Sequence, residues 1–125
     1  MAMNLNSEHL KAILRVKHLR KELIDDDDVT EEECRNFDNL SEDKRENVTA
    51  QVMYVMNHGF ANLLITYSNP IDQYVDPIKI YGERGIYLVC EVDGDNYTFF
   101  TNKKNAYTYA NEAYDIWLEI YSNEY

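Results

Sequence analysis

The sequence predicts an α+β fold, in which a small antiparallel sheet of three to four strands packs against N-terminal helices and a long C-terminal helix. Apolar residues recur at helical spacing before Gly59, alternate with polar residues after it, and return to helical spacing after Thr101. The 125 residues are the usual length of one domain. We therefore expect a single domain over 1–125, with a helical part at 1–58 and a sheet plus final helix at 59–125.

The first predicted helix covers residues 6–24, and Asn6 or Ser7 can cap its amino end. Five bases and one acid give residues 1–21 a net charge of +4. Basic side chains lie opposite an apolar stripe, so this helix should be amphipathic. The stripe consists of Ala12, Val16, Leu19 and Leu23, widened by Leu10, Ile13 and Leu14.

The charge reverses in an acidic segment at residues 22–46, where twelve acids and three bases give a net charge of −9. The aspartates at 25–28 should end the first helix and form a loop, because Asp is a poor helix former and negative charge opposes the dipole at a helix carboxyl end. Thr30 and Glu33 have the spacing of a capping box, which predicts a short helix to about Phe37.

A longer helix is predicted over residues 42–57. Ser41 can cap its amino end, and Gly59 is placed to terminate it. An apolar row on one side predicts the face that packs on the core. That row consists of Val48, Val52, Val55 and Met56.

Beyond the helical part, a period of two predicts strands, the first of them on a short apolar run at 60–67. Pro70 and Pro77 bracket a segment that we assign to a loop. Turn-rich tetrapeptides at 82–85 and 93–96 separate three further strands, which should form an antiparallel meander. These strands are expected at 78–81, 86–92 and 97–101. In the middle one, Ile86, Leu88, Cys90 and Val92 should share one face and Tyr87, Val89 and Glu91 the other.

The last predicted helix follows a Thr101 or Asn102 cap. Its apolar and aromatic arc is too wide for one sheet face to cover, so another helix or a binding partner should cover its tyrosine edge. The stripe contains Ala106, Ala110, Ala113, Trp117 and Ile120, with Tyr107, Tyr114 and Tyr121 along the edge.

No motif with a known catalytic or ligand-binding mechanism occurs, such as a P-loop, H-E-x-x-H or G-x-S-x-G. Cys34 and Cys90 lack the spacing of a metal site or redox motif and should be reduced thiols. The glutamates before Cys34 should make it a poor nucleophile. The D-G-D-N sequence at 93–96 fits a hairpin turn better than a calcium loop. We therefore expect no catalytic residue, no metal, no cofactor and no enzymatic activity.

The net charge of −11 and a pI near 4.5 disfavour direct binding to nucleic acid or to an anionic membrane. The expected partners are therefore basic proteins. The amino terminus has no cationic start followed by an apolar run, so we expect neither a signal peptide nor a membrane span, and a cytoplasmic location.

The densest carboxylates are candidate partner-binding residues. Carboxylates on a loop and adjoining helix can approximate the spacing of phosphates along a nucleic-acid strand, about 3.4 Å. They can therefore occupy the basic groove of a nucleic-acid-binding protein. A solvated loop with a capping box, or neutralisation by the chain's own basic helix, would explain the same residues. The candidates are Asp25, Asp26, Asp27, Asp28, Glu31, Glu32 and Glu33.

Tyrosine is unusually frequent, and all eleven tyrosines lie from Tyr54 onward. Large rings with a polar tip are typical of binding surfaces, but rings on a helix edge also pack on neighbouring elements. The tyrosines of predicted strands, Tyr81, Tyr87 and Tyr97, should be packing residues. The candidates for partner contact are Tyr74, Tyr107, Tyr114 and Tyr121.

In charge and size, the chain resembles the small acidic inhibitors that phages carry against host nucleic-acid enzymes, including anti-restriction and anti-CRISPR proteins. The resemblance is one of composition and assigns no residue. It implies a non-catalytic inhibitor or regulator that blocks a basic, nucleic-acid-binding protein in the host cytoplasm. The alternative is an assembly module, a homodimer that joins the basic helix of one copy to the acidic segment of the other.

Overall fold

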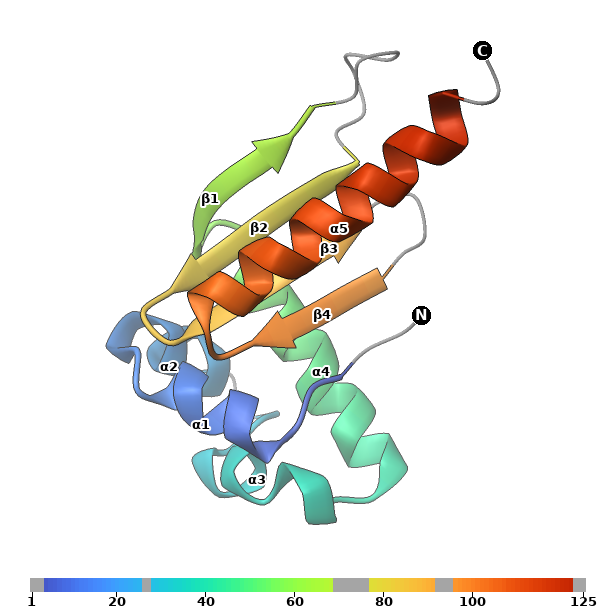
Figure 1. The fold of residues 1–125 in the computed structure, drawn as a ribbon. Coiled ribbons are helices and arrows are strands. Elements are labelled where there is room, and N and C mark those ends of the chain that lie inside the picture. The colour runs from blue at the N-terminus through green and yellow to red at the C-terminus, as the bar shows by residue number, and fades with distance from the viewer. Residues whose placement is uncertain (1–3, 26–27, 69–76, 92–95, 123–125) are drawn as a thin grey trace.

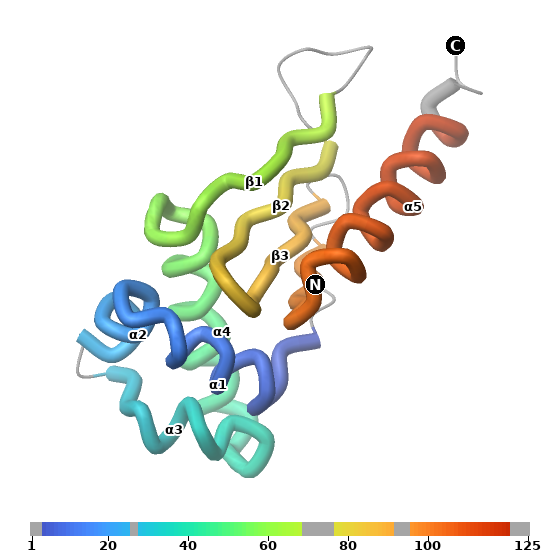
Figure 2. Tube along the Cα trace, turned by 60° about the vertical axis from the view of Figure 1, so that its left-hand side comes forward, coloured from blue at the N-terminus to red at the C-terminus, as the bar shows by residue number. Residues whose placement is uncertain are grey.

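The computed structural model describes residues 4–25, 28–68, 77–91 and 96–122, with side chains to residue 120. The elements form three layers (Figure 1), in which an antiparallel sheet separates the N-terminal helices from the C-terminal helix. Figure 2 shows the same arrangement from a second direction. The predicted α+β architecture is therefore confirmed.

The sheet is a four-stranded antiparallel meander in the order β1-β2-β3-β4, as predicted. Arg84 and Gly85 connect β2 to β3, and Gly85 has a φ of +87°, which suits glycine in a tight turn. Residues 70–76 of the predicted loop and 93–95 of the D-G-D-N turn lie outside the described residues. The strands are β1 (Asn62–Tyr67), β2 (Ile78–Glu83), β3 (Ile86–Glu91) and β4 (Asn96–Phe100).

Four helices cover one face of the sheet and enclose the larger core. Ile86, Leu88 and Phe99 point into this core and are at most 1% exposed. The helices are α1 (Ser7–Leu14), α2 (Lys17–Ile24), α3 (Glu31–Arg35) and α4 (Glu42–Asn57), with a 3₁₀ turn, η1 (Phe37–Asn39), before α4. The predicted buried face of α4, Val48, Val52, Val55 and Met56, is confirmed.

The single helix predicted over 6–24 is wrong, because the chain breaks into α1 and α2 at Val16, which is extended at φ −93° and ψ 107°. In one straight helix at about 100° per residue, Leu10 would lie opposite Leu19. One of the two would then face water. Both are 0% exposed, because the break reorients α2 toward the same core.

The predicted helix caps are present. Thr30 and Glu33 form the reciprocal capping box of α3. Ser41 caps α4, and Asn102 accepts a hydrogen bond from the third residue of α5. Asp25 follows the last residue of α2, so the aspartate run ends that helix as expected.

A single helix, α5 (Lys103–Ser122), covers the other face of the sheet. Ala106 and Ala110 are 0% exposed and let the helix approach Ile80 and Val89 closely. Its carboxyl-terminal part extends beyond the sheet (Figure 1). The strand tyrosines are packing residues, as predicted: Tyr81 and Tyr97 pack on the helical side of the sheet, and Tyr87 packs on the α5 side. None of the helices in the described part of the chain has the length and apolar character that a membrane span requires.

Candidate functional site

The acidic segment lies at the surface of the loop after α2, on α3 and on the first turns of α4. Within it, seven described carboxylate side chains are exposed and make no ion pair with another described residue. We set Asp38 apart, because its carboxylate accepts a hydrogen bond from the backbone of Ser7, and six remain. These residues form a group that we call the acidic surface. The acidic surface consists of Asp25, Asp28, Glu32, Glu42, Asp43 and Glu46.

Two of the predicted site residues are engaged within α3 itself. Glu31 pairs with Arg35 at 3.0 Å. Glu33 accepts hydrogen bonds from the backbone N–H and the hydroxyl of Thr30, both at 3.0 Å. The structure therefore divides the predicted cluster, with Asp25, Asp28 and Glu32 in the acidic surface and the other two in local contacts.

The aspartate loop is held beside α4. The side chain of Asn47 donates to the backbone carbonyl of Asp28 at 3.3 Å. Asn47 lies one helical turn after Asp43, so the loop and the first turns of α4 contribute carboxylates to one region. The charge of the acidic segment is therefore gathered in space as well as in sequence.

Four predicted residues fall where the structure gives no side chain. Asp26, Asp27 and Tyr74 lie outside the described residues, as does the side chain of Tyr121. Tyr107 and Tyr114 are half-buried and pack against the core under α5. The Tyr114 hydroxyl donates to the carbonyl of Ser68 at 2.7 Å, so the sheet side covers part of the tyrosine edge.

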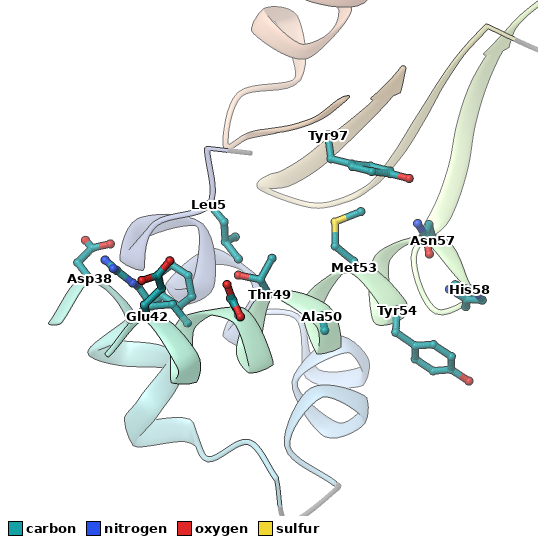
Figure 3. A pocket seen from close by; sticks show the side chains of 13 residues that line it. Leu5, Asp38, Glu42, Thr49, Ala50, Met53, Tyr54, Asn57, His58 and Tyr97 are labelled. Carbon is teal, nitrogen blue, oxygen red and sulfur yellow. The ribbon is translucent and has the colours of Figure 1, made fainter. Parts of the chain in front are cut away.

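A groove of about 900 Å³ runs along α4 on the face next to its buried face (Figure 3). Leu5, Met53 and Tyr97 give it apolar walls from three different parts of the chain. Leu5 is fixed because Asn4 exchanges two hydrogen bonds with the backbone of Phe99, at 2.6 and 2.9 Å. The first described residues of the chain thus lie along β4 and close one side of the groove.

The two ends of the groove differ chemically. Asp38, Glu42 and Glu46 line one end together with Arg45. Asn57 lines the other end, and Figure 3 shows it close to His58 and well away from Asp38. The Asn57 Oδ1 atom is buried and accepts no hydrogen bond from any described group.

Cations of the first two helices and of α3 line a second hollow, of about 380 Å³, which we call the basic cleft. Arg15, Lys17 and Arg20 make no ion pair with another described residue, whereas Lys11 pairs with Glu8 at 3.4 Å. The basic cleft therefore keeps most of its positive charge, although the whole chain is strongly acidic.

Neither cysteine is suited to nucleophilic chemistry. Both thiols are free and buried. Burial, reinforced by Glu33 and Glu31, raises the pKa of Cys34 to about 11, and burial raises the pKa of Cys90 to about 12. Both remain protonated at neutral pH. Among the described residues, no three His, Cys, Asp or Glu side chains are placed to hold a metal ion.

Sequence reasoning missed the groove, because its walls come from residues far apart along the chain. One signal was available in α4, where the lining residues recur at helical spacing beside the buried stripe. Met53 and Tyr54 are large side chains outside that stripe, and Tyr54 is 53% exposed. A second stripe of this kind indicates a helix that contacts two different environments.

Comparison with known proteins identifies no relative, since no protein-family model matches the chain and neither a curated protein nor a solved structure is significantly similar to it.

Proposed function

We propose that this protein is a stoichiometric inhibitor or regulator that binds a basic partner protein through the acidic surface and catalyses no reaction. One observation supports this above the others: the carboxylates of the acidic surface are exposed, and none of them makes an ion pair with a cation of the described residues. A partner's cations therefore displace no internal cation when they bind. Long-range attraction should also speed association at low salt.

A more specific part of the proposal concerns what the partner's contacted surface normally binds. Carboxylates on a loop and two helices can approximate the charge density of a phosphate backbone. We therefore propose that the partner uses the contacted surface to bind nucleic acid, and that the two ligands exclude each other. The protein would then act in the cytoplasm, and in the host cytoplasm if a phage encodes it.

Affinity capture with neutralised variants tests the proposal. A triple variant, Asp25→Asn with Asp28→Asn and Glu32→Gln, should bind the captured partner about tenfold more weakly or worse, because charge pairs across an interface are lost. Raised salt should release the wild-type complex, and so should added duplex DNA if the contacted surface is a nucleic-acid site.

A second triple variant provides the matched control. It changes three exposed residues of α5 and so removes the same number of negative charges away from the acidic surface. The substitutions are Glu112→Gln, Asp115→Asn and Glu119→Gln. This variant should retain the partner. Equal loss of the partner in both triple variants would show that only net charge matters, and the acidic surface would not be the site.

The basic cleft favours a second candidate, the self-association expected as the alternative from the sequence. The acidic surface of one copy can enter the basic cleft of another, because the two carry opposite charge. Sedimentation should then show a dimer at low salt that Arg15→Glu with Arg20→Glu dissociates. A wild-type monomer at high concentration and low salt would rule this candidate out.

A further inference from the structure

The groove along α4 is not needed for binding by charge alone, yet its lining restricts what can occupy it. Leu5, Met53 and Tyr97 pack on the larger core and still keep part of their surface exposed. An apolar side chain placed on them would remove apolar surface of both molecules from water. The flexible thioether of Met53 can adjust to the shape of that side chain.

One end of the groove favours a cation. Asp38, Glu42 and Glu46 stand there against Arg45 alone, and none of the four makes an ion pair with another described residue. The Asp38 carboxylate accepts a hydrogen bond from the backbone of Ser7 at 3.1 Å, which fixes its position. A Lys or Arg side chain at this end would gain the attraction of fixed carboxylates.

The other end of the groove favours a hydrogen-bond donor. The Asn57 Oδ1 atom is buried without a donor, which is rare for a buried side-chain acceptor and unfavourable. Beside it, the exposed ring of Tyr54 stacks on His58, with ring centroids 4.6 Å apart. Because this atom is closed to solvent, a ligand can reach it only when the Asn57 amide turns toward the groove that the residue lines. A backbone N–H of an extended peptide would then satisfy it, whereas those of a helix interior are already bonded.

We infer that the groove binds an extended segment of the basic partner protein, with an apolar side chain over Met53, a Lys or Arg toward Glu42 and Glu46, and a backbone N–H donating to Asn57. The inference rests on the proposed function, because the segment belongs to the same partner. From Glu42 to Asn57, the groove follows α4 for about 22 Å, because an α-helix rises by about 1.5 Å per residue. About seven extended residues span it.

Two synthetic heptapeptides provide the probe. Both carry two lysines at one end and have glycines elsewhere, and they differ only in a central Leu or Gln. Titrated into the ¹⁵N-labelled full-length protein, the Leu peptide should bind about tenfold more tightly, because the core of the groove is apolar. Its amide shifts should centre on Ala50, Met53 and the Asn57 side chain. Equal affinity of the two peptides, or shifts centred outside the groove, would overturn the inference.

A pair of charge-matched variants tests the location. Ala50 is exposed in the groove, so Ala50→Arg should block it and weaken binding of the Leu peptide about tenfold while α4 remains helical. Thr108→Arg adds the same charge at an exposed position of α5 and should bind like wild type. If Ala50→Arg does not fold, Glu42→Gln with Glu46→Gln replaces it and should weaken binding about threefold. Wild-type affinity in the blocking variant would refute the inference.

Capture of the partner protein distinguishes failure of the groove inference from failure of the proposed function. If Ala50→Arg retains the partner and the Asp25, Asp28 and Glu32 variant loses it, the groove inference is wrong and the proposed function stands. If Ala50→Arg loses both peptide and partner while the Asp25, Asp28 and Glu32 variant retains the partner, the groove is the contact and those three carboxylates are not.

Discussion

The two faces of the sheet are covered in different ways. On the helical side, four helices bury large side chains such as Leu88 and Phe99 almost completely. On the other side, α5 is the only described element that covers the sheet, and Ala106 and Ala110 make its closest approach. The first face therefore depends on filled volume, whereas the second depends on close approach of one helix.

This difference explains why tyrosines are frequent in the carboxyl-terminal half of the chain. One helix cannot cover a four-stranded sheet, and half-buried rings fill the margins on both of its sides. Their hydroxyls reach polar partners: Tyr67 donates to Asn111 at 2.6 Å and Tyr109 to Glu91 at 2.8 Å. Burial raises the pKa of both phenols. A ring with a polar tip suits such a margin as well as it suits a binding surface.

The largest effect is expected where the helical side loses volume. Leu88→Ala should lower the free energy of unfolding by about 2–5 kcal/mol, because Leu88 is 0% exposed and the surrounding helices cannot collapse fully into the cavity. Urea denaturation measures the loss. The control is Leu63→Ala, at a side chain that is 52% exposed. Similar losses in the two variants would contradict the role of Leu88 in the larger core.

The α5 side should instead be sensitive to added volume. Ala110→Leu should cost about 1–3 kcal/mol, because the larger side chain pushes α5 away from the sheet. Hydrogen exchange should then increase in α5 and remain slow in α4. Thr108→Leu, at an exposed position of the same helix, should have little effect. Equal loosening of both helices would show that the two cores are not independent.

Most of the fold could be predicted from the sequence, because the information was local. Capping residues such as Thr30 and Ser41 and the change of period after Gly59 mark element boundaries within a few residues. The break at Val16 could not be predicted in this way. Leu10 and Leu19 both need burial, and only the position of the core shows that one straight helix cannot bury both.

The candidate site was predictable only in part. A run of aspartates indicates exposure by itself, and Asp25 and Asp28 are exposed. Which glutamates stay unpaired depends on side-chain geometry within α3, where Glu31 lies one turn before Arg35. The groove required the position of Leu5 beside β4, which depends on the long-range contact between Asn4 and Phe99.

A smaller effect is expected at the cap of α3, on the helical side. Thr30→Ala removes the acceptor for the Glu33 backbone N–H and should lower the free energy of unfolding by about 1 kcal/mol. Thr30→Ser keeps the hydroxyl and should stay close to wild type. Chemical denaturation of the two variants gives the comparison, and equal stability would mean that the cap contributes nothing.

The smallest effect is expected at the margin of α5. Tyr114→Phe removes only the hydrogen bond to Ser68, and the ring keeps its contacts with Tyr67 and Trp117, at centroid distances of 5.1 and 6.1 Å. Because the Ser68 carbonyl is at the surface, water can replace the hydroxyl, and the loss should be about 0.5 kcal/mol. Tyr54→Phe is the matched control, since Tyr54 is exposed and its hydroxyl makes no hydrogen bond to a described group. A loss in Tyr114→Phe as large as that in Ala110→Leu would mean that the tyrosine margin, and not the alanine contact, holds α5 on the sheet.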